Sequence, residues 1–316
     1  MHKPKRTALR ALLALVAAFA LAAVPPAAEG SRGLLYKVSG PQGQAYILGS
    51  IHVGDAAMYP FHSEIQHAME ASDTFVYECD TTSAEAKAAL RARMALPEGL
   101  TLADAIGDDL YAQVSAVCDH LGLPIAALDG LRPWAVINTL AVYTTAAELG
   151  ADSANQALSL GVEEQVRAKA APLHKTVAYL ETPQEQVDVL EGFSDALQRY
   201  LLESECQVIL HPESARGMDS TIALWPAWWR AGDAQAFADQ YLQSYLEPGF
   251  EAEGAEYHQA LITQRNARMA ERLYAMLEKG GTFFVTVGLM HLVLPEDSLL
   301  TQLQARGCTV EAVYEP

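Results

Sequence analysis

The stretch YILGSIHVG, residues 46–54, decides how this chain folds. β-Branched and aromatic side chains run up to a glycine, and His52 follows that glycine by three residues. Near the other end of the chain, FFVTVGLMHLV (283–293) repeats the pattern with His291. A glycine directly after a strand permits a tight turn and a close backbone approach. Each stretch therefore predicts a buried strand that ends in a G-x-x-H turn.

Further strand patterns lie near both ends of the chain, and helical patterns fill the middle. The predicted strands cover residues 33–40, 44–51, 73–80, 281–290 and 308–315. Residues 83–280 follow helical periodicity with proline and glycine interruptions, apart from one isolated strand pattern, KTVAYLET. Because short connections between neighbouring elements are preferred, we predict an α/β (α+β) fold. Its central sheet is built from N- and C-terminal strands, with a large helical insertion between them.

The first 28 residues have the pattern of a secretory signal. Four cations precede an apolar run at residues 11–24, and small residues follow it, as in cleaved signal peptides. Cleavage between Ala23 and Ala28 would leave residues 29–316 as a single domain in the periplasm or outside the cell. The run is shorter than the ~20 apolar residues that span a membrane, so we expect no membrane span after cleavage. A retained N-terminal anchor is the alternative.

The charge of the chain argues against nucleic acid as a partner. The formal net charge is −18, and loss of the four signal cations would take it to −22. The mature chain has no Lys- or Arg-rich run. Nucleic acids and anionic membrane surfaces are therefore poor partners for it.

The cysteines leave their pairing open. The mature chain contains Cys79, Cys118, Cys206 and Cys308. Their spacing matches no zinc-ribbon pattern, and four cysteines allow three disulfide connectivities. An exported protein could pair them, and buried free thiols are the equal alternative.

Several side chains with metal-binding chemistry follow predicted strands. Ligands of open α/β sheets bind beyond the carboxyl ends of the strands, where His52 and His291 lie. We expect their strands to be neighbours, which would bring the imidazoles within ~8 Å of each other. Glu78 ends the strand pattern TFVY, and Asp80 lies on the same face of an extended chain. Two histidines and a carboxylate suit a divalent transition metal such as Mn, Co or Zn.

Each of these residues also has a structural interpretation. A histidine after a strand is commonly a half-buried packing residue. Glu78 could solvate the end of a strand or cap the helix predicted to begin near Ser83. The repetition of the G-x-x-H pattern is what favours a functional site over these alternatives.

A helical segment near the C-terminus directs two polar residues toward the core. In LITQRNARMAERLYAML, Asn266 falls within the apolar stripe at ~100° per residue, and Arg265 lies at the edge of that stripe. Polar groups that face a core need partners. We therefore expect both to be buried, with Arg265 directed at the histidines or bonded to Glu78 or Asp80. A purely structural salt bridge is the alternative.

The order and spacing of several motifs resemble the TraB/GumN family, which includes PrgY and is related to the animal Tiki proteins. The motifs are LLYKVSGPQGQAYILGSIHVGDAAMYPF, TFVYE, LGLPIAALDGLRPW, ETPQEQ, QRNARM and VGLMHLV. The resemblance runs from about Gly33 to Tyr314. It implies an α/β fold with a helical middle, similar in its core to the erythromycin esterase and haem-binding ChaN proteins. Tiki proteins are described as metal-dependent proteases.

Carried over by position, the resemblance implies a site in this chain. Its metal ligands would be His52, Glu78 and His291, with Arg265 close by. Glu163, in LGVEEQV, matches a further acidic position of the family.

The sequence departs from the family pattern at both motifs. Ser50 stands where threonine is usual, which keeps a hydroxyl group. Leu294 and Pro295 follow the second motif where a glycine is usual.

Together these features indicate a periplasmic or secreted metal-dependent hydrolase that acts on a peptide or protein. The metal would polarise a carbonyl group and activate water, and Arg265 would stabilise the developing negative charge. Glu163 or Asp80 would accept the proton of the water or orient a histidine. One rival is a non-catalytic envelope protein that binds a peptide or haem. The other is a structural envelope protein whose histidines belong to its core.

Overall fold

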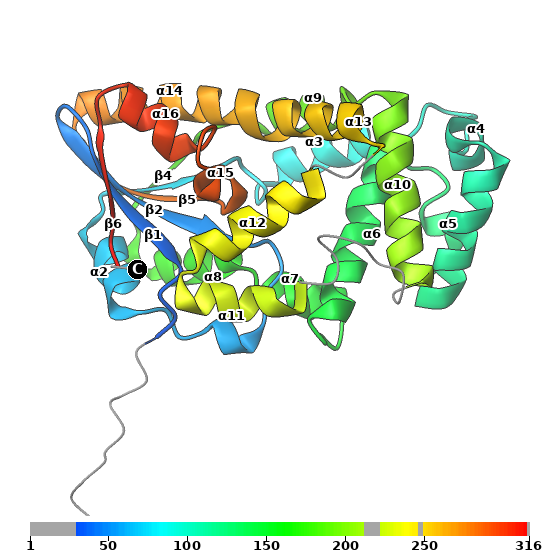
Figure 1. The fold of residues 1–316 in the computed structure, drawn as a ribbon, viewed down its shortest axis with the longest axis horizontal. Helices are drawn as coiled ribbons and strands as arrows, with labels where there is room; N and C mark the ends of the chain where they lie inside the picture. The colour runs from blue at the N-terminus through cyan, green and yellow to red at the C-terminus, as the bar shows by residue number, and fades with distance from the viewer. Residues whose placement is uncertain (1–29, 212–221, 246–248, 315–316) are drawn as a thin grey trace, which may run out of the picture.

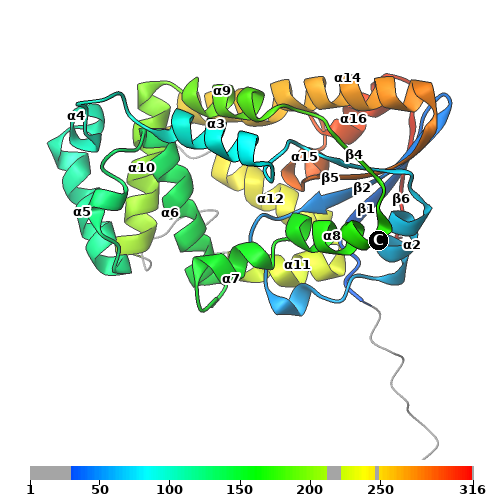
Figure 2. The same cartoon turned by 180° about the vertical axis from the view of Figure 1, so that it is seen from behind.

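The computed structural model describes residues 30–211, 222–245 and 249–314, so the signal predicted at residues 1–28 lies outside the described residues. The described chain forms a six-stranded mixed sheet covered by helices, with further helices at one end (Figures 1 and 2). The predicted α/β class is confirmed, because the sheet takes strands from both ends of the chain. Among the described helices, none has the length and apolar character needed to span a membrane.

The sheet combines a parallel centre with an antiparallel edge. Its strands are β1 (Leu34–Ser39), β2 (Gly43–Ser50), β3 (Thr74–Tyr77), β4 (Thr176–Tyr179), β5 (Gly281–Gly288) and β6 (Thr309–Ala312). They lie in the order β4-β3-β5-β2-β1-β6. β1 pairs antiparallel with β2 and β6, whereas β2, β5, β3 and β4 run parallel to one another. The strand predicted within KTVAYLET is β4, which joins this sheet at its edge instead of standing alone.

Helices cover both faces of the sheet and form a lobe beside it. They are α2 (Ser63–Ala71), α3 (Ala84–Met94), α4 (Leu102–Ile106), α5 (Asp108–Leu121), α6 (Pro133–Glu148), α7 (Ala154–Ser159), α8 (Val162–Ala170), α9 (Pro183–Glu191), α10 (Asp195–Leu210), α11 (Trp225–Ala231), α12 (Ala234–Tyr245), α13 (Glu251–His258), α14 (Gln264–Lys279), α15 (Met290–Val293) and α16 (Leu299–Ala305). α14 and α16 bury one face of the sheet. α2, α8 and α11 bury the other face. α4, α5, α6 and α10 share a separate core in the helical lobe (Figure 1).

The register of β2 and β5 places the two G-x-x-H turns side by side. These strands are adjacent and parallel, and Ser50 pairs with Gly288 at their carboxyl ends. The backbone N–H of Leu289 donates to the carbonyl of Ser50 at 2.9 Å, so the pairing continues into the second turn. The prediction that the two strands are neighbours is confirmed.

The first G-x-x-H turn packs directly against the start of α8. The N–H of Val162 donates to the carbonyl of Ile51 at 2.9 Å. A Cβ atom on Gly161 would lie 2.2 Å from the carbonyl oxygen of His52. Real Cβ atoms do not approach an oxygen so closely, so only glycine allows this contact. The backbone of α8 therefore sets the position of the His52 turn.

We expect Gly161→Ala to lower the free energy of unfolding by about 1–3 kcal/mol, because the added methyl group overpacks a backbone contact. Gly161 has φ −59 and ψ 144, which alanine also adopts, so the cost is steric. Gly130→Ala is the control, since a Cβ atom there meets nothing within 4 Å. Urea unfolding followed by circular dichroism measures both. Equal stability of the two variants would contradict the close-contact argument.

Candidate functional site

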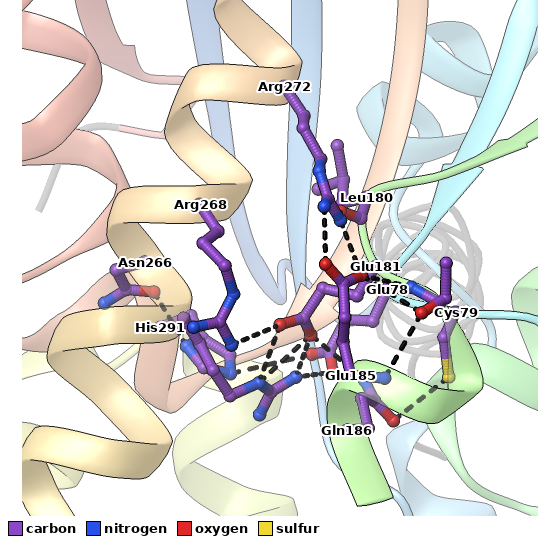
Figure 3. Close-up of polar contacts among 12 residues, drawn as sticks. Glu78, Cys79, Leu180, Glu181, Glu185, Gln186, Asn266, Arg268, Arg272 and His291 are labelled. Atoms are coloured by element: carbon purple, nitrogen blue, oxygen red, sulfur yellow. Dashed lines mark hydrogen bonds and ion pairs between the residues drawn. The ribbon is translucent and has the colours of Figure 1, made fainter. Parts of the chain in front are cut away.

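Two of the predicted site residues, Glu78 and His291, lie close together beyond the carboxyl ends of the parallel strands (Figure 3). Glu78 directly follows β3, and Glu181 lies two residues after β4. The N–H of Glu181 donates to the carbonyl of Glu78 at 2.6 Å, which joins these two strand ends. His291 lies in α15, shortly after β5, and Arg265 reaches the same point from α14.

Arg265 is the centre of a buried ionic cluster. Its side chain is mostly buried, as the helical stripe predicts, with the residue only 8 % exposed. Nη2 donates to Glu78 Oε2 at 2.7 Å and to Glu181 Oε2 at 2.6 Å. Nε donates to Glu181 Oε2 at 3.0 Å. The predicted bond between Arg265 and Glu78 is confirmed, and Nη1 has no hydrogen-bond acceptor among the described residues.

Glu78 is held as a carboxylate by several donors. Its Oε2 also accepts from Gln186 Nε2 at 3.0 Å, and its Oε1 accepts from the N–H of Gly288 at 2.5 Å. Burial by itself raises the pKa of Glu78, but Arg265, the two histidines and the Gly288 N–H outweigh it. The pKa of Glu78 therefore lies well below its usual range, and the side chain is charged at neutral pH.

His291 is buried and its tautomer is fixed by its neighbour. Asn266 Nδ2 donates to the carbonyl of Asp297 at 2.5 Å, so Asn266 Oδ1 is free to accept from His291 Nδ1 at 2.7 Å. The remaining nitrogen, Nε2, carries a lone pair and lies 3.8 Å from Glu78 Oε1. Burial and the charge of Arg265 lower the pKa of His291 to about 3, despite the opposing effect of Glu78. His291 is therefore neutral at physiological pH.

His52 stands at the exposed side of this cluster. Its side chain is exposed, unlike that of His291, and no described residue forms a hydrogen bond with its ring. It interacts electrostatically with Glu78, Glu163 and His291. The structure therefore places His52 in the neighbourhood of the other predicted ligands.

Glu163 lies in the first turn of α8, next to the His52 turn. Its Oε1 accepts from Nε and Nη2 of Arg167, at 3.0 Å and 2.8 Å. The Arg167 guanidinium in turn lies over the Tyr77 ring, 3.7 Å from its centroid. Burial raises the pKa of Glu163, although Arg167 and His52 act in the opposite direction. Glu163 and Glu78 are thus two nearby carboxyl groups with opposite pKa shifts.

Asp80 is engaged in local structure instead of the cluster. Its Oδ1 accepts from the N–H groups of Thr82 and Ser83, at 2.9 Å and 3.1 Å. These bonds close the turn that leads into α3. Of the two proton acceptors suggested by the sequence, Glu163 is the one that the structure places beside the buried cluster.

Two cluster residues were missed by sequence reasoning. Glu181 is only 2 % exposed and shares Arg265 with Glu78. Gln186 bridges Glu78 and Glu181 from α9. Both lie in the motif ETPQEQ, and the signal for Glu181 was its position near the end of the strand pattern KTVAYLET.

The chemistry of His291 and Glu78 fits a divalent metal. Their facing atoms, Nε2 and Oε1, are both lone-pair donors and lie 3.8 Å apart. Zinc bonds of ~2.1 Å to nitrogen and to oxygen would let one ion contact both atoms. Arg265 pairs with both buried carboxylates, and Arg268 Nη2 also lies 3.4 Å from Glu181 Oε1. Among the described residues, no three His, Cys, Asp or Glu side chains surround one point.

Comparison with known proteins identifies one family. A profile of the TraB/PrgY/gumN family matches residues 34–312, which is most of the described chain. A search of curated proteins finds no match. A search of solved structures finds none either.

We expect Arg265→Met to lower the free energy of unfolding by about 3–5 kcal/mol, because it leaves Glu78 buried without its guanidinium partner. Lys279→Met, on the same helix, is the matched control. Lys279 is exposed in the last turn of α14, so its loss should cost at most about 1 kcal/mol. Denaturant unfolding measures both values, and similar losses would show that Arg265 behaves as a surface charge.

Proposed function

Because the chain belongs to the TraB/PrgY/gumN family, we propose that it is a metal-dependent hydrolase and, in particular, a peptidase. The observation that carries the proposal is the pair of facing lone-pair atoms, His291 Nε2 and Glu78 Oε1. Nearby hydrogen bonds fix both atoms before any metal arrives. A peptide substrate is favoured by the resemblance to the Tiki proteins. The N-terminal signal pattern favours action in the periplasm or outside the cell.

In this proposal, His52, Glu78 and His291 hold the metal. A bound Mn, Co or Zn ion would activate a water molecule and polarise the substrate carbonyl group. Asn266 keeps His291 Nε2 unprotonated and ready to bind, which is the usual task of a hydrogen-bond partner behind a metal-binding histidine. Arg265 and the Gly288 N–H keep Glu78 ionised and hold its Oε1 toward His291 Nε2.

The other polar residues have roles in proton transfer and charge stabilisation. Glu163 accepts the proton of the attacking water, because its raised pKa makes it a better base than Glu78. Two carboxyl groups with pKa values pushed apart are the usual sign of such a division. Arg265 has two N–H groups on Nη1 that no described residue uses. These are the donors that we assign to the developing oxyanion.

His291→Ala, His52→Ala and Glu78→Gln should each lower metal affinity at least about 100-fold, since loss of a ligand costs more than loss of a residue behind it. His67→Ala is the control, because its side chain is 68 % exposed on α2. Metal content by mass spectrometry, beside circular dichroism, measures the effect on folded protein. A wild-type protein without metal affinity at neutral pH would refute the proposed mechanism.

Glu163→Gln should keep metal binding and lower turnover of a cleaved peptide by about 10²- to 10⁴-fold, the range for loss of a general base. The neighbouring Glu164→Gln is the matched control, because Glu164 is exposed on the same helix turn. Metal titration and peptide cleavage, followed on the same preparations, separate binding from proton transfer. Full activity of Glu163→Gln would show that another group accepts the proton of the water.

A further inference from the structure

The amide of Gln186 connects the two buried carboxylates. Its Nε2 donates to Glu78 Oε2 at 3.0 Å and to Glu181 Oε2 at 3.2 Å. Its Oε1 accepts from Cys79 Sγ at 3.0 Å. Gln186, Cys79, Glu78 and Glu181 converge from two strand ends and one helix (Figure 3). Both N–H groups of the amide and its oxygen are therefore used inside the cluster.

From this geometry we propose that Gln186 is a positioning residue that holds Glu78 and Glu181 in place, and that the Cys79 thiol fixes the direction of its amide. The proposal builds on the metal-dependent function above, because the oxygen that Gln186 leaves free is the one assigned to the metal. The family match does not identify Gln186 or Cys79 as functional.

A primary amide suits this position for a chemical reason. Two carboxylates that share one guanidinium still repel each other, and both are almost fully buried. The NH2 group of Gln186 gives one N–H to each of them without adding a charge. A glutamate would add a third negative charge, and a leucine would leave buried acceptors with fewer donors.

The bonds of Gln186 also select one oxygen of Glu78. Oε2 receives the Arg265 guanidinium and the Gln186 amide, at 2.7 Å and 3.0 Å. Oε1 receives only the Gly288 N–H and faces His291 Nε2. Without Gln186, Oε2 loses one of its two donors, so the plane of the carboxylate is held less firmly. Gln186 therefore acts on the metal position through Glu78 without touching the metal.

Cys79, together with the two carboxylates, determines which end of the amide faces Glu78 and Glu181. A thiol hydrogen donates to the amide oxygen, so the NH2 group must point to Glu78 and Glu181. In the reverse orientation the amide oxygen would face two negative charges. Cys79 is 4 % exposed and directly follows Glu78 in the chain. Serine keeps this donor, whereas alanine removes it.

The position of Gln186 is itself fixed by the start of α9. Thr182 and Glu185 form a reciprocal cap, in which each side chain accepts from the backbone N–H of the other residue. Glu185 also pairs with Arg272 of α14 at 2.6 Å. The first turn of α9 is therefore anchored on the same helix that carries Arg265, and Gln186 follows in the next position.

The test compares Co²⁺ binding of four full-length variants with the wild-type protein. Gln186→Leu should weaken Co²⁺ affinity about 10- to 100-fold and change the visible Co²⁺ spectrum, as expected for a residue behind a ligand. Gln184→Leu, exposed on the same helix, should change neither. Cys79→Ala should weaken affinity, and Cys79→Ser should stay within about threefold of the wild-type value, because the hydroxyl keeps the donor. Wild-type affinity and spectrum in Gln186→Leu would overturn the proposal.

A second measurement separates this proposal from the metal-dependent function. If the wild-type protein binds no Co²⁺, the proposed function fails, and the role of Gln186 is decided by unfolding in urea. Cys79→Ala and Gln186→Leu should each lower the urea midpoint, and the double variant should lower it no further than Gln186→Leu alone. Additive shifts would show that the two side chains act independently and would overturn the proposal.

Discussion

The guanidinium of Arg265 is shared by two carboxylates that come from different strand ends, and the arrangement of the site depends on this sharing. Arg265 is the only buried Lys or Arg side chain among the described residues. Burial of an unpaired charge costs several kcal/mol, whereas a paired and hydrogen-bonded charge is tolerated. Glu78 therefore has to lie against α14, and so does Glu181. The carboxyl ends of β3 and β4 are fixed relative to the helix by charge as well as by packing.

A change in helix type directly before α14 accompanies the burial of Arg265. Residues Gln259–Thr263 form a π-helical turn directly before α14. A π turn holds one more residue than an α turn, so the helix presents a different face after it, and such turns are frequent at functional sites. α13 has no buried residue before the π turn, whereas Arg265 and Asn266 are buried immediately after it. The turn allows one continuous helical segment to leave solvent and supply two buried polar side chains.

The sequence predicts those parts of the site that depend on local periodicity. Strand ends place His52 and His291 on adjacent strands, and the apolar stripe of α14 places Arg265 and Asn266 inside. The contribution of Glu181 depends on β4 pairing with β3, a contact between residues about 100 positions apart that periodicity does not encode. Asp80 lies on the same face of an extended chain as Glu78, but its carboxylate accepts hydrogen bonds from nearby backbone N–H groups. The position of the His52 turn depends on its backbone contact with the start of α8, which is equally non-local.

The pKa values of Glu78 and Glu163 shift in opposite directions because their hydrogen-bonding partners come from different parts of the chain. Glu78 receives a guanidinium and a backbone N–H from distant segments, and these, with the two histidines, outweigh its burial. Glu163 has Arg167 one helical turn away, and Arg167 divides its interactions between that carboxylate and the Tyr77 ring. Burial therefore prevails at Glu163. A carboxylate that stays charged is suited to hold a cation. A carboxylate with a raised pKa is suited to accept a proton. The fold thus gives the two glutamates different chemistry by surrounding one of them with more donors than the other.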